Sequence, residues 1–84
     1  MARLKITRAT GETILSITPV VEVAFEKYAG QGLYKQLREF ERNSDLYWLA
    51  HNALMRTEVI APYGDDFLST LISVEVIEDE SPKG

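Results

Sequence analysis

The hydrophobic pattern of this chain changes its period at Thr18-Pro19, and this change constrains the fold more than any other feature. Before it, residues 3–8 and 13–17 alternate polar and apolar side chains on either side of a turn at residues 9–12, as in a β-hairpin. After it, apolar residues recur with the period of helices. Because a lone hairpin is only marginally stable in water, it must pack against those helices. The sequence therefore predicts an α+β fold that is mainly α, with an N-terminal β-hairpin.

About four short helices are expected after the hairpin. Thr18 is a favoured N-cap and Pro19 suits the first helical turn, so the first helix is predicted over residues 19–29. Gly30 and Gly32 follow it, and glycine commonly ends a helix.

The remaining elements are shorter or less regular. A second helix is predicted over residues 33–42 and a third over 45–57, with Ser44 as the cap of the third. Asp65 is expected to cap a fourth helix, and an extended C-terminal segment, strand or arm, is expected at 73–77. The fourth helix is predicted to hold four apolar residues, Phe67, Leu68, Leu71 and Ile72.

The length of 84 residues indicates one domain, expected over residues 1–77, and the acidic segment 78–84 is predicted to be a disordered tail. The absence of cysteine excludes disulfides and thiolate metal sites and favours the cytoplasm. No signal-peptide pattern and no apolar run of about 20 residues is present, so no membrane association is expected. The net charge of −4 argues against a general affinity for nucleic acid.

Catalysis finds little support, so the chain is expected not to be an enzyme and to need no cofactor or metal. His51 is the single histidine, which excludes Cys/His chemistry and a two-histidine zinc site. Residues 30–32 form a lone Gly-x-Gly, and Lys35 stands where a dinucleotide-binding loop needs a third glycine. Asp65 and Asp66 are expected to cap a helix rather than to bind a cation.

The third predicted helix is apolar on two faces. One face holds a full core stripe, Leu46, Leu49, Ala50, Ala53 and Leu54. Trp48, His51 and Met55 line up on the other face, next to Tyr47. Either the hairpin or the fourth helix covers this second face, or it is a surface for self-association or for a protein partner. These four residues are the first candidate binding residues.

Lys35, Arg38 and Arg42 form a basic stripe on the second predicted helix. Such a stripe is commonly a solvated face. The alternative is that it steers an acidic partner, or the acidic residues 78–80 of a neighbouring copy, toward the protein.

Five short motifs resemble one protein family: residues 17–19 (Ile-Thr-Pro), 24–26 (Ala-Phe-Glu), 45–50 (Asp-Leu-Tyr-Trp-Leu-Ala), 66–68 (Asp-Phe-Leu) and 74–76 (Val-Glu-Val). Together they resemble the tail assembly chaperones of long-tailed bacteriophages, over about residues 17–77. The Tyr-Trp-Leu-Ala element is the most specific. His51 departs from the pattern, in which an aromatic residue follows Trp-Leu-Ala. The family has no catalytic residues.

The resemblance implies a role in virus assembly. Such chaperones bind the long, helical tape measure protein in the host cytoplasm, keep it soluble while tail tube subunits polymerise, and are absent from the virion. A chaperone that coats a long helix acts in many copies, so a homo-oligomer is expected. The family generally makes a longer form by ribosomal frameshifting, through which tail tube subunits could be contacted, and a C-CCA-AAR run can encode residues 81–83.

Two alternatives keep the fold and change the role. The chain could be a structural head–tail connector or tail-end protein of the virion. It could also be a small nucleic-acid-binding regulator, which the acidic balance disfavours.

Overall fold

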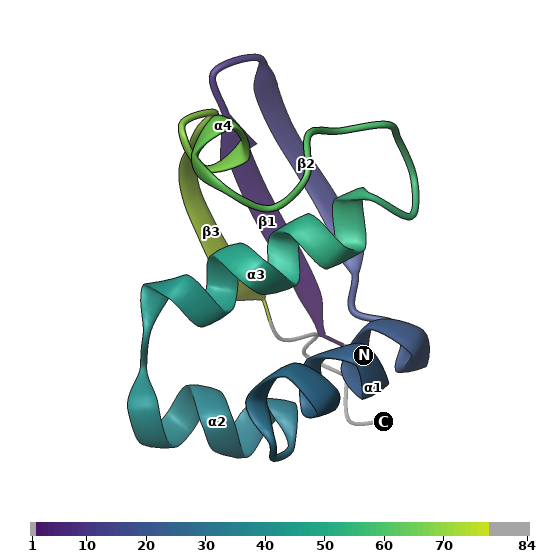
Figure 1. The fold of residues 1–84 in the computed structure, drawn as a ribbon, viewed down its shortest axis with the longest axis vertical. Coiled ribbons are helices and arrows are strands. Elements are labelled where there is room, and N and C mark those ends of the chain that lie inside the picture. Colours follow the sequence, from purple (N-terminus) through teal and green to yellow (C-terminus); the bar gives the residue numbers. More distant parts are fainter. Residues whose placement is uncertain (1, 78–84) are drawn as a thin grey trace, which may run out of the picture.

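The computed structural model describes residues 2–77. Within these residues the fold is α+β, with a three-stranded antiparallel sheet and four helices (Figure 1). The elements follow in the order β1 (Arg3–Arg8), β2 (Gly11–Ser16), α1 (Pro19–Ala29), α2 (Leu33–Phe40), α3 (Asn43–Leu54), α4 (Asp65–Leu68) and β3 (Leu71–Ile77). The tail expected at 78–84, with the codons considered for 81–83, lies outside the described residues.

The N-terminal hairpin is confirmed. In its register Leu4 pairs with Leu15 and Ile6 pairs with Thr13, so the alternation places these side chains on one face of the sheet. The second strand starts at Gly11, two residues before the predicted start. The turn holds only residues 9 and 10, rather than the predicted residues 9–12. Gly11 has φ 140°, a backbone conformation that side chains disfavour.

The third strand pairs with β1, so the order in the sheet is β2-β1-β3. Ile6 lies opposite Val74, and Leu4 lies opposite Val76. The register then shifts, because Thr7 pairs with Ser73 but Arg8 pairs with Leu71. Ile72 therefore forms a β-bulge at one end of the strand.

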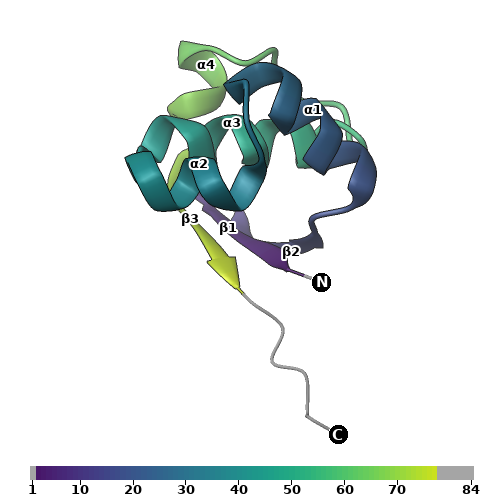
Figure 2. The ribbon, with the colours of Figure 1, turned by 90° about the horizontal axis from the view of Figure 1, so that it is seen from below.

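All four helices of the described chain lie on one face of this sheet, as Figure 2 shows. The core forms between that face and the helices. Its fully buried members include Leu4 and Ile6 from β1, Phe25 from α1, and Leu49 and Leu54 from α3. No helix within residues 2–77 is long and apolar enough to cross a bilayer.

The first helix has the predicted bounds, and the second and third do not. Gly30 ends α1 in the left-handed region, with φ 83°. The second helix ends at Phe40 rather than at 42, because Glu41 is also left-handed, with φ 49°. The third helix begins at Asn43, so Ser44 lies inside its first turn and is not its cap; the third helix ends at Leu54 rather than at 57.

The fourth helix was predicted too long. It is a single turn, and Gly64 rather than Asp65 occupies its N-cap position. Leu71 and Ile72 belong to β3, where a bulge interrupts the alternation that would have identified them as strand residues. β3 is the second neighbour of β1 and completes the three-stranded sheet.

Candidate functional site

Trp48 is covered by α1. Its ring stacks on Tyr28, with 4.3 Å between centroids and 10° between planes, and it meets Phe25 edge-on at 5.9 Å. The indole is half-buried as a result. The cover at Trp48 is therefore the first helix, and not the hairpin or the fourth helix predicted for this face.

His51 is covered by the segment that leads into α4 and by α4 itself. Its Nε2 lies 2.8 Å from the carbonyl oxygen of Ala61, so this nitrogen donates the hydrogen bond. The ring also meets Phe67 edge-on at 4.8 Å and Tyr63 at 5.7 Å. His51 therefore packs between backbone and aromatic rings, as a structural histidine does.

Tyr47 and Met55 complete the set of candidates on the third helix. Tyr47 is half-buried and packs against the core, whereas Met55 is 48% exposed at the end of α3. The structure therefore does not bring Trp48, His51 and Met55 together as one open surface. Two are covered by different elements, and one is exposed.

The basic stripe is also divided. Lys35 and Arg38 are exposed on α2. Arg42 lies beyond α2, at the N-cap position of α3, where its guanidinium pairs with Asp45. Of the three cations, only Lys35 and Arg38 thus lie exposed on α2, where they can contact a partner.

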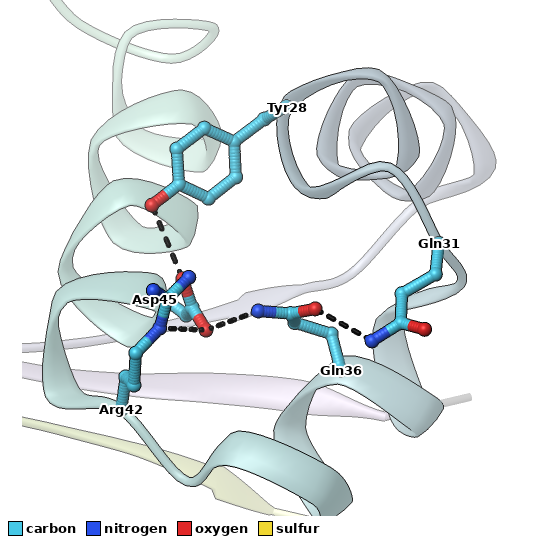
Figure 3. A network of polar contacts seen from close by, with 5 residues as sticks. All are labelled: Tyr28, Gln31, Gln36, Arg42 and Asp45. Atoms are coloured by element: carbon cyan, nitrogen blue, oxygen red, sulfur yellow. Dashed lines mark hydrogen bonds and ion pairs between the residues drawn. The ribbon is translucent and has the colours of Figure 1, made fainter.

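Asp45 is the centre of a polar network that joins three helices (Figure 3). Its side chain is fully buried. One carboxylate oxygen accepts hydrogen bonds from the Tyr28 hydroxyl at 3.1 Å and from Arg42 Nη2 at 3.1 Å. The other accepts from Gln36 Nε2 at 3.0 Å and from Arg42 Nε at 3.3 Å. Gln31 extends the network by donating to Gln36 Oε1 at 2.7 Å.

The network shifts the titration of its members. Burial alone would raise the pKa of Asp45, but hydrogen bonds from Gln36, Arg42 and Tyr28 and the charge of Arg42 outweigh it and lower that pKa. The pKa of Tyr28 is raised by burial and by its hydrogen bond to the Asp45 carboxylate. The network fixes the ionised carboxylate of Asp45 between α1, α2 and α3, and the role of this carboxylate is structural.

Sequence reasoning assigned Asp45 only a favourable position near the start of a helix. Its partners Gln36 and Tyr28 lie 9 and 17 residues away. The local signal available was the spacing of three between Arg42 and Asp45, which places the two side chains on one side of a helical turn.

The outward face of α1 is apolar, which the sequence analysis missed. Val20 is 57% exposed and Val23 is 51% exposed. With four neighbours they line a shallow groove, here called the α1 groove: Pro19, Val20, Val23, Ala24, Lys27 and Arg56. Because Val21 and Phe25 are buried on the opposite side, α1 is apolar on two faces and only one is covered.

Charge at the α1 groove is positive. Lys27 and Arg56 line it, and among residues 2–77 neither lies within ion-pair distance of a carboxylate. Arg56 donates from Nε to Asn52 Oδ1 at 3.2 Å, and because this amide is neutral, no carboxylate of the described residues compensates the charge of Arg56. The α1 groove thus combines exposed valines with two cations.

A second apolar groove runs beside β3. It is lined by Leu37, Glu41, Arg42, Leu46 and Val76 and is here called the β3 groove. Its apolar members come from α2, α3 and the sheet. It therefore lies where the helical layer meets the outer strand.

No known protein family, curated protein or solved structure matches this chain. Within residues 2–77 no group of three histidine, aspartate or glutamate side chains is placed to hold a metal ion.

Proposed function

We propose that this chain is a phage tail assembly chaperone, which binds the tape measure protein in the host cytoplasm and keeps it soluble until the tail tube forms around it. The motifs at residues 17–19 and 45–50 support the family. The α1 groove is the observation that carries the binding role. In this proposal the chaperone is absent from the mature virion.

The α1 groove fits an apolar helix. Val20, Val23 and Ala24 stand at positions i, i+3 and i+4 and so form a stripe along one side of α1. An amphipathic helix can lay its own stripe against such a surface. Lys27 and Arg56 would meet carboxylates at the edge of the bound stripe, which increases the association rate and selects the partner.

The strength of one such contact is small. Fully burying a valine side chain stabilises by about 1.5 kcal/mol or more, and Val20 and Val23 are already about half-buried, so each adds ~1 kcal/mol. A single copy therefore binds weakly. Many copies on one long helix, or copies joined to each other, gain avidity without any new kind of contact. This requirement fits a chaperone that acts as a homo-oligomer.

A longer form made by frameshifting, through which tail tube subunits are recruited, belongs to the same proposal. The coding sequence tests it directly. A slippery C-CCA-AAR run at residues 81–83 with an open −1 frame beyond it supports the longer form, and a tail without such a run contradicts that part.

Co-expression tests the proposed function. In this proposal the partner is the tape measure protein of the same phage, and the readout is the fraction of that partner in the supernatant. The double variant Val20→Asp/Val23→Asp should return the partner to the pellet. Ile14→Asp, which places one such carboxylate at an exposed residue of β2, should not.

Mass spectrometry of purified particles separates the proposal from its alternative. A chaperone should be missing from the particle, whereas a head–tail connector or tail-end protein should be present. A partner that remains equally soluble with and without this chain would contradict the chaperone role.

A further inference from the structure

The outer edge of β3 is open. In the order β2-β1-β3 the third strand has a hydrogen-bonding neighbour on one side only among the described residues. Its sequence, Leu-Ile-Ser-Val-Glu-Val-Ile, holds one charged residue, Glu75, and neither lysine nor proline. Natural proteins usually guard such edges with charges, prolines or bulges, because an unguarded edge pairs readily with another strand. Here the bulge at Ile72 affects one end only, and residues 73–77 follow a regular register.

We infer that the free edge of β3 pairs with β3 of a second copy of this chain, so that two three-stranded sheets become one continuous sheet related by a two-fold axis. This inference does not rest on the proposed function. It follows from three features that make this edge complementary to the same edge of a second copy. They are an exposed isoleucine, an apolar groove and the position of a single charge.

The exposed isoleucine and the groove lie at opposite ends of the same strand. Ile72 is 65% exposed. Four residues further on, Val76 lines the β3 groove together with Leu37 and Leu46. In the bulge Leu71 and Ile72 together oppose Arg8, and counting back from the regular residues 73–77 gives Ile72 the side of Val74 and Val76, which is the helix side of the sheet. A strand that runs antiparallel to β3 can therefore bring its own residue 72 to the groove.

One register satisfies this condition on both copies at once. If the two-fold axis passes between Val74 and the partner's Val74, Ile72 lies opposite the partner's Val76, and each groove receives one isoleucine. In the same register Ser73 lies opposite the partner's Glu75, a hydroxyl beside a carboxylate. Residues directly opposite in an antiparallel pair contact each other through their side chains. An isologous interface of this kind closes on itself and stops at two copies.

The neighbouring register is unfavourable. A shift of two residues would place Glu75 directly opposite the partner's Glu75, and like charges in that position destabilise a sheet. A shift of one residue would turn the apolar side chains of one copy to the face of the sheet that lies away from the helices. A shift of two residues the other way would place Ile72 opposite the partner's Val74, which does not line the groove. The charge at position 75 and the groove at Val76 thus together select the register centred on Val74.

The other edge of the sheet lacks the same complementarity. A groove beside β2 is lined by Leu15, Val21 and Ala53 among others. The exposed apolar residue of that strand is Ile14, which pairs with Lys5 on the face away from the helices. On the helix side β2 holds Leu15, which already packs against the core, so an antiparallel copy of β2 would bring no exposed apolar side chain to that groove.

Sedimentation equilibrium of the full chain, between about 5 and 500 μM, tests the inference. The wild-type chain should dimerise, and Ile72→Asp should weaken the dimer at least about tenfold. Ile14→Asp is the matched control, and it should dimerise as the wild type does. A wild-type chain that stays monomeric overturns the inference, and so does an Ile14→Asp chain that loses the dimer.

Charge at position 73 tests the register without touching an apolar residue. Ser73→Glu places a second carboxylate opposite the partner's Glu75 and should weaken the dimer, whereas Ser73→Lys should retain or strengthen it. Both variants are at an exposed position, so far-ultraviolet circular dichroism should show an unchanged fold. If the two variants dimerise equally, this register is wrong.

Disulfide trapping gives a positive readout, because the chain has no cysteine of its own. Residues opposite each other in adjacent strands have Cα atoms about 4.5–5.5 Å apart, within the range that a disulfide bridges. The double variant Ser73→Cys/Glu75→Cys should form covalent dimers under mild oxidation. Glu75→Cys alone should not. Efficient linking by Glu75→Cys alone would show the shifted register and overturn the one inferred.

Discussion

Tyr28 of α1 stacks on Trp48 of α3 while its hydroxyl donates a hydrogen bond to the buried carboxylate of Asp45 in that same helix. One side chain thus joins two helices through its ring face and through its polar end. The two contacts lie within a turn of each other on α3, so α1 is fixed in both position and rotation. That rotation is what leaves Val20 and Val23 on the outward face.

Trp48→Ala should lower the free energy of unfolding by about 2–3 kcal/mol, because a half-buried indole with two ring partners is lost. Urea denaturation followed by far-ultraviolet circular dichroism measures this change. Met55→Ala removes an exposed side chain of the same helix and should cost less than about 1 kcal/mol. Equal effects of the two variants would contradict the packing described for Trp48.

Asp45→Ala should lower the free energy of unfolding by about 2–3 kcal/mol, because Tyr28, Gln36 and Arg42 all lose their acceptor. A double-mutant cycle with Tyr28→Phe measures how much of this loss belongs to the Tyr28–Asp45 bond. A coupling energy of about 0.5 kcal/mol or more is expected, since the two side chains touch. Full additivity would show that the bond contributes nothing.

Stability should fall in acid because of Asp45. The pKa of this carboxyl is lower in the folded chain than in the unfolded chain, so its contribution is complete above the unfolded pKa, about 4. That contribution is lost as the pH falls through the lower, folded pKa. Asp45→Asn should remove this part of the pH dependence, and Arg42→Ala, which keeps the carboxylate but removes its cation, should move the loss to higher pH. Denaturant midpoints measured from pH 7 to pH 2 check both expectations.

Gly30→Ala should destabilise the chain by about 1 kcal/mol, because Gly30 is left-handed with φ 83° and a β-carbon strains that conformation. No atom lies within 4 Å of the position a β-carbon would occupy, so the effect is one of backbone strain and not of collision. Gly30→Asn is the control, since asparagine tolerates this region better. Thermal unfolding should rank the wild type above Gly30→Asn and Gly30→Ala last.

Glu41→Gly should stabilise the chain by about 0.5–1 kcal/mol. Within residues 2–77 Glu41 is the single residue other than glycine with a positive φ. Glycine relieves the strain of a left-handed side-chain-bearing residue, although it also loses more entropy on folding. Glu41→Ala keeps the strain and should give no gain. A shift of the urea midpoint in Glu41→Gly alone is the expected result.

The elements with strong local signals could be predicted from the sequence. Alternation identified the hairpin, and Thr18-Pro19 with Gly30 placed both ends of α1. The junction between α2 and α3 could not be placed, because nothing local indicates that Glu41 adopts a left-handed conformation. Ile72 was assigned to a helix, since a bulge disturbs the alternation there.

The candidate site was predicted less well than the fold, because coverage of a helix face depends on the tertiary arrangement. Periodicity placed Trp48, His51 and Met55 on one side of the third helix, yet α1 and the segment before α4 cover two of them and leave the third open. Val20 and Val23 were not identified from the sequence as an exposed apolar surface. Their exposure depends on the rotation of α1, which is set by the packing of Tyr28 and Phe25.

The neighbouring positions of the first and last strands in the sheet also determine when the protein can fold. Arg3 pairs with Ile77, so the central strand meets its second neighbour only after residues 71–77 have been synthesised. Pairing between residues so distant in sequence raises the contact order and slows folding relative to a purely helical protein of this size. A nascent chain on the ribosome can form the hairpin early, but one edge of β1 stays open until β3 emerges. A circular permutant that joins β3 to β1 by a short loop would make this pairing local, and it should fold faster than the natural chain.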